Sequence, residues 1–395
     1  MNPARKTSAA GKKIKQKPER YLYRGHRTLS IMPTYTCPAA CTDCGTLSTP
    51  QERTRLDVEY IIAAIDEAKE LGFFNVVFTG GEATLRWHDL LPCIGHARSL
   101  GFPVRLVTNA HWATDLEMAR EKLAELIDAG LSEINYSTGD EHVRFVSIER
   151  VAYATVAACE RAFRVHVMVE MKKDNTILRD SLLQHPLVAA LSDEQRQWLT
   201  VVPSPWMPLS PSTVHRYPAG STTTRRNLAM RPGCESVLQT YTVQADGNVG
   251  SCCGLGLRVI PELNVERVEQ PGFLRRAIAE SEEDFLKLWI HYFGPEQIVA
   301  WAAKHNPNIK WEGLYAHRCQ VCQRLYHDDA VRTVIREHWE EVVAEVLQAA
   351  WLDEVHVPTT MGELWREGRA AENSTAENSS ITPPVVEAAP SPARL

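Results

Sequence analysis

Six short strand patterns that alternate with helical patterns, and a change of rhythm after Pro203, predict an α/β protein. We expect the first part to form a partial (β/α)6 TIM-like barrel and the rest to form a smaller mixed α+β C-terminal domain. The length of 395 residues fits more than one domain, and the apolar fraction of 44% is enough for a real core.

The strand candidates are short runs rich in β-branched and aromatic residues. They cover Thr28–Met32, Asn75–Phe78, Val104–Val107, Glu133–Tyr136, Val165–Met171 and Leu199–Val202. The helical patterns between them repeat apolar residues at three- and four-residue steps, and the first ends before Gly72. The others cover Leu90–Leu100, Leu116–Ala129, Ile148–Phe163 and about Ile177–Leu191. Because the carboxyl ends of the strands meet at one rim of such a barrel, we expect the chemistry there.

The C-terminal half begins with a proline-rich stretch that breaks any helix. Thr240–Gln244 and Asn248–Cys252 flank Asp246-Gly247 and predict a β-hairpin with a tight turn. Helical stretches follow over 272–304 and 328–351. We therefore expect four segments, listed here: a disordered basic arm (1–22), the barrel (23–210), the C-terminal domain with its helices (211–355) and a disordered tail (370–395).

Composition narrows the possible classes of function. The net charge of −6 argues against a broad nucleic-acid-binding face. No run approaches the ~20 apolar residues that span a bilayer, and the basic N-terminus lacks the features of a secretory signal. We therefore expect a cytoplasmic protein without a membrane or nucleic-acid partner. In such a protein, the clustering of most of the 10 cysteines indicates metal or cluster ligands rather than disulfides.

Three cysteines, Cys37, Cys41 and Cys44, follow the first predicted strand within eight residues. A zinc site usually has four protein ligands, or three with water. Three thiolates suit a [4Fe–4S] cluster whose fourth iron is left open for another ligand. A structural zinc knuckle and three incidental buried cysteines remain as alternatives.

The C-x3-C-x2-C spacing resembles that of the radical S-adenosylmethionine (radical SAM) enzymes, and Gly80-Gly81-Glu82 at the end of the second strand supplies that family's second signature. The resemblance covers about 28–202. It implies that the cysteines hold a SAM-binding [4Fe–4S] cluster and that the Gly-Gly-Glu segment binds the amino group of SAM. Glycines allow close backbone approach, and a carboxylate pairs with an ammonium group.

Polar residues at the next strand ends are further candidates. Asn109 at the end of the third strand and Ser137 at the end of the fourth lie where members of this family contact SAM. Asp43 occupies a position that is commonly aromatic in the family and lies near the adenine, and Tyr35 or a backbone contact is a possible substitute. A further cluster, which we expect either to cap loops or to lie at the mouth of the active site, comprises Asp140, Glu141 and His142.

A second cysteine set lies in the C-terminal half: Cys234, Cys252, Cys319 and Cys322. The hairpin turn returns Cys252 toward Cys234, and Cys319-Gln-Val-Cys322 is a two-ligand clip, so four thiolates could hold zinc or an iron–sulfur cluster. The opening of this pattern is similar to the SPASM and twitch extensions of radical SAM enzymes, which implies an auxiliary [4Fe–4S] cluster. Whether Cys252 or Cys253 is the ligand stays open. His317 is expected to cap or pack, with a role as a ligand as the alternative.

The resemblance implies an enzyme that reductively cleaves SAM to a 5′-deoxyadenosyl radical, which then abstracts a hydrogen atom from a substrate. It favours a peptide or protein substrate (a peptide-modifying maturase) and a flavodoxin- or ferredoxin-type electron donor. One alternative is a radical SAM dehydrogenase acting on a small molecule. Another alternative is a non-catalytic electron-transfer protein that binds an iron–sulfur cluster or zinc. Such a protein would not need Glu82, so the Gly80-Gly81-Glu82 segment disfavours it.

Overall fold

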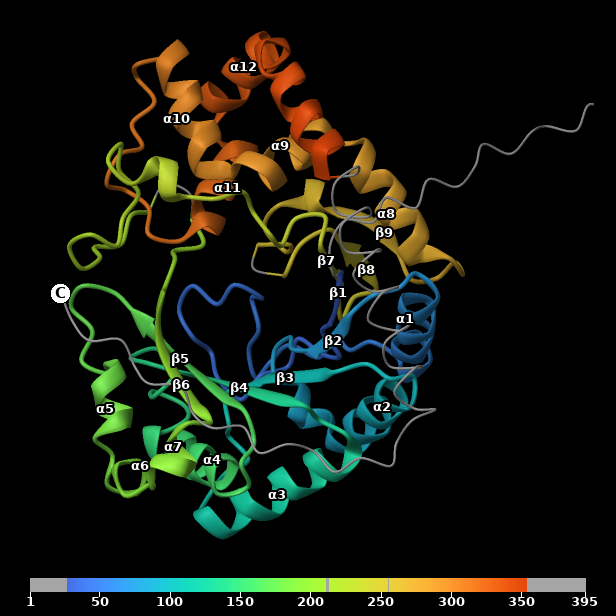
Figure 1. The fold of residues 1–395 in the computed structure, drawn as a ribbon, viewed down its shortest axis with the longest axis vertical. Helices are drawn as coiled ribbons and strands as arrows, with labels where there is room; N and C mark the ends of the chain where they lie inside the picture. The colour runs from blue at the N-terminus through green and yellow to red at the C-terminus, as the bar shows by residue number, and fades with distance from the viewer. Residues whose placement is uncertain (1–26, 211–212, 255, 354–395) are drawn as a thin grey trace, which may run out of the picture. The chain divides into compact units, whose positions relative to one another are not determined.

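The computed structural model describes residues 27–210, 213–254 and 256–353. The expected basic arm (1–22) and tail (370–395) lie outside the described residues. The described residues up to Ala350 belong to one compact unit, whose fold is shown in Figure 1. None of the helices in the described part of the chain combines the length and the apolar character needed to cross a bilayer.

The strands form one nine-stranded sheet in the order β6-β5-β4-β3-β2-β1-β7-β8-β9. Their bounds are β1 Thr28–Ile31, β2 Asn75–Phe78, β3 Val104–Thr108, β4 Glu133–Thr138, β5 Val165–Met171, β6 Leu199–Pro205, β7 Thr240–Val243, β8 Asn248–Gly250 and β9 Asn264–Arg267. Strands β1 to β6 pair in parallel with their neighbours, and the order runs from one edge to the other without closing. The expected α/β class, with an open partial barrel, is confirmed.

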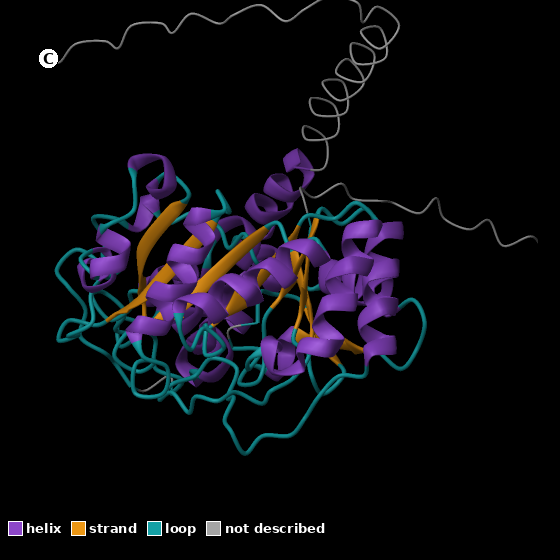
Figure 2. Ribbon diagram, turned by 90° about the horizontal axis from the view of Figure 1, so that it is seen from below, coloured by secondary structure: helices purple, strands orange, loops and turns teal. Residues whose placement is uncertain are grey.

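Helices connect the parallel strands and continue beyond them. Their bounds are α1 Val58–Glu70, α2 Trp87–Ser99, α3 Leu116–Ala129, α4 Ile148–Glu160, α5 Arg179–Leu183, α6 Pro186–Ala189, α7 Asp193–Arg196, α8 Phe273–Glu283, α9 Phe285–Phe293, α10 Pro295–His305, α11 Arg318–His327 and α12 Asp329–His338, with short 3₁₀ helices η1 Ala83–Arg86, η2 Leu228–Met230, η3 Pro261–Leu263 and η4 Trp339–Glu341. Helices α1 to α4 pack against one another in chain order, and their apolar faces cover the buried residues of the sheet. Figure 2 shows helices lying beside the strands.

The single helix expected over Ile177–Leu191 is wrong, because this segment and its continuation contain the three short helices α5 to α7. Pro186 lacks a backbone N–H and disfavours helical geometry at the residue before it, and His185 is accordingly non-helical. Ser192 then caps α7, with its side chain accepting a hydrogen bond from the backbone N–H of Gln195.

The helical stretch expected over 272–304 forms, and it is divided into α8, α9 and α10. The side chain of Asp284 accepts from the backbone N–H of Lys287 and so begins α9. Gly294 has a positive φ of 82° and precedes Pro295, which starts α10.

The predicted hairpin forms, but it extends the barrel sheet. Strand β7 pairs in parallel with β1, matching Thr28 to Thr240 and Ile31 to Val243, while β7, β8 and β9 pair antiparallel. The expected boundary at 210/211 therefore does not interrupt the sheet. A second hydrophobic cluster drawn from residues 234–346 surrounds the later helices, so the C-terminal part has a core of its own.

Candidate active site

A cavity of about 330 Å³ lies at the carboxyl ends of the parallel strands. Its wall contains the cluster ligands and SAM-binding residues proposed from the sequence, apart from Tyr35: Cys37, Cys41, Cys44, Gly80, Gly81, Glu82, Asn109 and Ser137. Asn109 directly follows β3, and Ser137 is the penultimate residue of β4. Parallel pairing brings these strand ends to one rim, which is why segments a hundred residues apart share one cavity.

The loop of the cysteine triad is held by backbone pairing. The N–H of Cys37 donates to the carbonyl of Thr49 (3.1 Å), and that of Tyr35 donates to the carbonyl of Thr54 (3.0 Å). Burial raises the pKa of both Cys37 and Cys41 to about 12. Converging buried thiols become thiolates readily only beside a cation, so this donor set fits an iron cluster.

Gly80 and Gly81 let the second strand continue beneath the cysteine loop. The N–H groups of Gly81 and Glu82 donate to the carbonyls of Thr34 and Thr36, each at 2.9 Å. A Cβ on Gly81 would lie 2.4 Å from the carbonyl oxygen of Thr36, so only glycine fits there. The structure thus adds a second role for these glycines, the close approach of two backbone segments.

The carboxylate of Glu82 is 1% exposed and joins three segments. Its Oε1 accepts hydrogen bonds from the N–H and the hydroxyl of Thr84 and from the hydroxyl of Thr108 (2.8 Å). Its Oε2 accepts from the N–H of Asn109 (2.8 Å), whose side-chain amide in turn donates to Sγ of Cys37 (3.5 Å). Within the described residues Oε2 has this one donor, which leaves acceptor capacity on the cavity side for an ammonium group.

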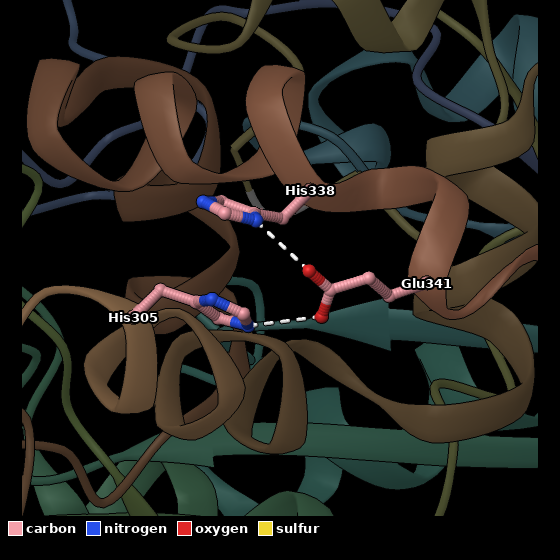
Figure 3. Close-up of side chains that lie close together, drawn as sticks. All are labelled: His305, His338 and Glu341. Carbon is pink, nitrogen blue, oxygen red and sulfur yellow. Dashed lines mark hydrogen bonds and ion pairs between the residues drawn. The ribbon is translucent and has the colours of Figure 1, made fainter.

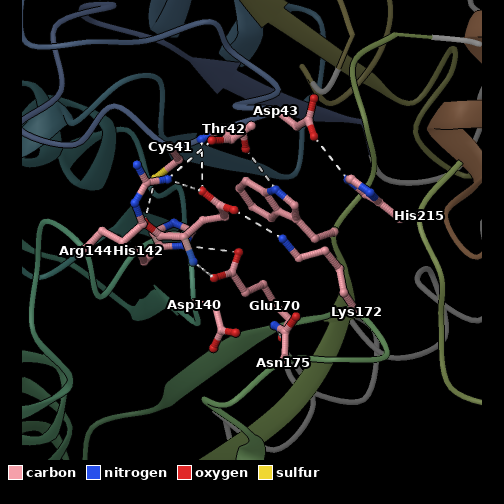
Figure 4. Close-up of polar contacts among 12 residues, drawn as sticks. Cys41, Thr42, Asp43, Asp140, His142, Arg144, Glu170, Lys172, Asn175 and His215 are labelled. Carbon is pink, nitrogen blue, oxygen red and sulfur yellow. Dashed lines mark hydrogen bonds and ion pairs between the residues drawn. The ribbon is translucent and has the colours of Figure 1, made fainter. Parts of the chain in front are cut away.

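Glu170, near the end of β5, is a buried carboxylate in the same wall. Burial raises its pKa to about 7. Its Oε2 lies 4.0 Å from Nδ1 of His142, and neither atom makes a hydrogen bond within the described residues. Burial also lowers the pKa of His142 to about 4, so this imidazole is neutral at pH 7. Figure 4 shows both side chains beside Cys41.

Asp140, Glu141 and His142 point to three different parts of the structure. Asp140 caps the loop after β5 by accepting hydrogen bonds from the N–H groups of Thr176 and Ile177. Glu141 holds the cysteine loop, since its carboxylate accepts from the N–H of Thr42 (3.2 Å) and its carbonyl from Sγ of Cys41 (3.8 Å). His142 alone of the three lines the cavity.

Asp43 and Tyr35 do not form an aromatic platform for adenine. Asp43 accepts from the N–H of Leu209 and lies 3.1 Å from Nε2 of His215, which ties the cysteine loop to the segment after β6 (Figure 4). Tyr35 is 1% exposed and does not line the cavity. Its ring lies under the guanidinium of Arg258 at 4.0 Å, and its role as a substitute for the aromatic residue stays a prediction.

The second cysteine set converges on another cavity, of about 370 Å³, lined by Cys234, Cys252, Cys253, Cys319 and Cys322. Burial raises the pKa of Cys234, Cys252 and Cys322, and hydrogen bonding to Cys253 followed by burial raises that of Cys319. These thiols lie close enough to affect one another's ionisation, as a shared metal site requires. None of the ten cysteines forms a disulfide.

Three residues form a wall common to both cavities: Pro205, Cys253 and His317. His317 begins α11, and its Nδ1 accepts from the N–H of Cys319 (3.2 Å), so the expectation that it caps is confirmed. The sequence analysis did not predict that Cys253 also lines the first cavity. No periodic pattern in the sequence around Cys253 indicates this position.

Sequence reasoning also missed Glu170 and Trp206, which line the first cavity. Glu170 could have been found by the rule that identified Asn109 and Ser137, since it is a polar residue at the carboxyl end of a predicted parallel strand. Trp206 gave no such signal. Its position depends on a hydrogen bond from its indole N–H to the carbonyl of Thr42 (3.0 Å).

Comparison with known proteins gives three kinds of similarity. The Radical SAM superfamily model matches residues 31–175. The PqqA peptide cyclase of Bradyrhizobium diazoefficiens is 35% identical over 108 residues, and the match covers 26% of this chain and 26% of that relative's length. Among solved structures, native anSMEcpe with bound AdoMet and Cp18Cys peptide aligns with a TM-score of 0.48 at 13% identity, covering 82% of this chain and 98% of that one. Streptococcus suis SuiB bound to precursor peptide SuiA aligns with a TM-score of 0.44 at 14% identity, covering 68% and 65%.

Proposed function

We propose that the radical SAM domain formed by residues 31–175 makes this chain an enzyme that reductively cleaves S-adenosylmethionine and removes a hydrogen atom from a substrate. One observation carries the proposal: the cysteine triad and the Gly80-Gly81-Glu82 segment line the same cavity, at the carboxyl ends of parallel strands. A protein whose cysteines were only structural would have no need of a buried carboxylate with spare acceptor capacity facing that cavity.

Each part of the cavity has a role in holding the cofactors. Cys37, Cys41 and Cys44 would hold a [4Fe–4S] cluster with one iron open to SAM, and Glu82 Oε2 would accept a hydrogen bond from the SAM ammonium. When bound, these groups supply a 5′-deoxyadenosyl radical. Asn109 keeps Cys37 in place through its side-chain amide, and Ser137 offers a hydroxyl at the rim of β4.

The remaining wall serves the substrate. Met168, Trp206 and Met207 are apolar and would exclude water from the reacting atoms. Glu170, with its pKa at about 7, can hold or release a proton near neutral pH at Oε2, where it faces neutral His142.

We assign Cys234, Cys252, Cys319 and Cys322 to an auxiliary [4Fe–4S] cluster that exchanges an electron with the substrate side of the first cavity. The shared wall supports this assignment, because Pro205, Cys253 and His317 alone contribute to both cavities within the described residues. Zinc at the second site is the competing assignment.

For the substrate we favour a peptide or protein, modified by a maturase-type reaction. The partial match to a PqqA peptide cyclase supports this choice. The electron for SAM cleavage would come from a flavodoxin- or ferredoxin-type donor.

The test is anaerobic reconstitution of the full chain, followed by incubation with SAM, dithionite and a panel of synthetic peptides and small molecules. Mass spectrometry would quantify 5′-deoxyadenosine and modified substrate. Replacing Cys37, Cys41 and Cys44 together by Ala should remove about four irons per chain and abolish 5′-deoxyadenosine.

Cys93→Ala is the matched control, because Cys93 is a buried cysteine of α2 that lines neither cysteine cavity. This variant should keep its iron and its SAM cleavage. Reductive SAM cleavage that persists in the folded triple variant would overturn the proposed function.

A further inference from the structure

Two histidines and a glutamate converge on the C-terminal helices, away from both cysteine cavities. They are His305 at the end of α10, His338 at the end of α12 and Glu341 at the end of η4 (Figure 3). Glu341 Oε2 lies 3.3 Å from Nε2 of His305, and Oε1 lies 2.9 Å from Nδ1 of His338. The three potential ligand atoms all lie within 4.8 Å of one another.

Aromatic packing fixes the two imidazoles before any ligand binds. Their rings stack at a centroid distance of 4.2 Å and an interplanar angle of 27°. The ring of Trp301 packs against that of His305 at a centroid distance of 4.7 Å, and the ring of Trp289 packs against Trp301 at a centroid distance of 4.9 Å. A site whose donors are held in this way loses little side-chain entropy when it takes up a ligand.

The donor set is that of a first-row transition metal. Imidazole nitrogens and a carboxylate oxygen bind zinc at about 2.0–2.2 Å, so tetrahedral ligand atoms lie about 3.3–3.6 Å apart. Each imidazole nitrogen already lies near one carboxylate oxygen of Glu341, His305 at 3.3 Å from Oε2 and His338 at 2.9 Å from Oε1, and a small movement of the carboxylate would bring one oxygen within ligand spacing of both. The side chains of His305, His338 and Glu341 are 22%, 37% and 52% exposed, so a metal can enter and keep a water molecule as its fourth ligand.

We propose that His305, His338 and Glu341 form a surface site for a divalent transition metal of the zinc type, with two imidazoles, one carboxylate and one solvent ligand. A hollow beside the site is lined in part by Asp329 and Glu337, whose negative charge attracts a cation. The proposal does not depend on the proposed function, because it uses no residue of either cysteine cavity.

The bound metal would brace the helices around the second cysteine set. Helices α10 and α12 pack against each other, and both pack against α11, which carries Cys319 and Cys322. Joining the ends of α10 and α12–η4 through a metal therefore limits the separation of the two helices that flank the cysteine clip.

The test titrates Co²⁺ and then Zn²⁺ into the full chain after its iron sites have been reconstituted, so that the cysteines are occupied. The wild-type protein should bind one equivalent of Co²⁺ with visible bands of a four-coordinate nitrogen and oxygen site and without the near-ultraviolet charge-transfer band of a thiolate ligand. Zn²⁺ should displace the Co²⁺ and raise the Tm.

Glu341→Gln and His305→Ala should each weaken Co²⁺ binding at least tenfold and remove the Zn²⁺-dependent rise in Tm, with iron content unchanged. Glu341→Gln is the safer variant for folding, because Glu341 is exposed and glutamine can keep a hydrogen bond to one histidine. His96→Ala is the matched control: His96 pairs with Asp66 at 2.6 Å on the surface but has no third donor in the described residues, so Co²⁺ binding should be unchanged.

Two results would overturn the proposal. One is equal Co²⁺ binding by the wild-type protein, Glu341→Gln and His305→Ala. The other is a wild-type Co²⁺ spectrum with thiolate bands alone, in which case the three residues form a hydrogen-bonded cluster without a metal.

Discussion

Two carboxylates in the wall of the first cavity have opposite surroundings. Glu82 accepts four hydrogen bonds, three of them on Oε1, and is held by its neighbours. Glu170 accepts from the N–H of Glu141, but its Oε2 faces the imidazole of His142 without a hydrogen bond in the described residues. The first environment suits a fixed charge for a cationic ligand, and the second suits a group that exchanges a proton.

Replacing Glu82 should separate SAM binding from cluster assembly. Glu82→Gln removes the charge that would pair with the SAM ammonium, a contact worth about 1.5–3 kcal/mol, so SAM affinity should fall roughly 10- to 150-fold. Iron content should stay close to that of the wild-type protein. Equilibrium dialysis with labelled SAM and iron analysis measure the two quantities.

Thr84→Val is the control for Glu82→Gln. It deletes one hydrogen bond to Glu82 (2.6 Å) but keeps the charge, and Thr84 does not line the cavity. This variant should lose about 1 kcal/mol of stability and keep its SAM affinity. Unchanged affinity in folded Glu82→Gln would remove Glu82 from the SAM site.

Glu170 should make stability depend on pH. Its pKa is about 7 in the folded chain, against 4.5 as its ordinary value, so the folded state binds more protons between these pH values and loses stability as pH rises through them. Glu170→Gln lacks this effect. Its free energy of unfolding relative to wild type should therefore rise by up to about 3 kcal/mol between pH 4.5 and 8. Urea unfolding of preparations matched in iron content measures this, and a difference that does not vary with pH would contradict it.

At the scale of elements, the site depends on how the loop after β1 rests on the continuation of β2. The N–H groups of Thr79, Gly81 and Glu82 extend backbone pairing past the end of β2. They donate to carbonyls at the end of β1 and in the loop that follows it. The cysteine triad follows in the same loop. A substitution that moves the loop after β1 away from the end of β2 should therefore displace the cysteine ligands, even though the cysteines are unchanged.

Gly81→Ala tests that coupling. The new Cβ would lie 2.4 Å from the carbonyl oxygen of Thr36 and 2.7 Å from the carbonyl carbon of Tyr35, and backbone atoms cannot swing aside. We expect a loss of at least about 1–3 kcal/mol of stability and a fall in iron bound by the triad, measured by urea unfolding and iron analysis.

The control for Gly81→Ala is Gly95→Ala, in the middle of α2. Its nearest contact would be an ordinary 3.7 Å, and removing a helical glycine should add about 0.5–1 kcal/mol of stability. Wild-type iron content in Gly81→Ala would show that the loop does not depend on this close approach.

At the scale of the whole molecule, one continuous sheet connects two cysteine cavities. Strand β7 joins the barrel edge at β1, and β8 leads directly to Cys252 and Cys253. Arg258 adds a second connection, since its guanidinium donates to the carbonyls of Thr46 (2.9 Å) and Leu47 (3.1 Å) in the loop after Cys44.

The auxiliary assignment is testable in a chain that lacks Cys37, Cys41 and Cys44. After anaerobic reconstitution, this variant should keep about four irons and a low-temperature paramagnetic signal on reduction, because any remaining cluster belongs to the second site. Adding Cys319→Ala and Cys322→Ala should erase both. Iron analysis, sulfide analysis and electron paramagnetic resonance measure the outcome.

In the same background, Cys252→Ser should lose the cluster and Cys253→Ser should keep it. Cys252 is 5% exposed within the second cavity, whereas Cys253 belongs to the wall of both cavities. If only Cys253→Ser loses the cluster, then Cys253 is the cluster ligand and Cys252 is not. Stoichiometric zinc without sulfide would make the second site structural.

The sequence by itself determined the six parallel strands, most barrel helices and the cysteine and SAM-binding residues proposed for the first cavity. Strand patterns depend on local alternation, and residues that follow parallel strands must share one rim, so Cys37, Glu82 and Asn109 could be placed together without coordinates. The sequence also identified the hairpin between Cys234 and Cys252 through its Asp-Gly turn.

Only the tertiary structure decided which distant segments meet. Nothing local in β7 specifies that it pairs with β1, because that pairing depends on burial against a sheet formed two hundred residues earlier. The position of Cys253 between two cavities and the convergence of His305, His338 and Glu341 likewise result from packing between elements. Local propensity determines which secondary structure a segment forms. The wall shared by the two cysteine cavities and the cluster of two histidines and a glutamate depend instead on long-range contacts, which no single segment encodes.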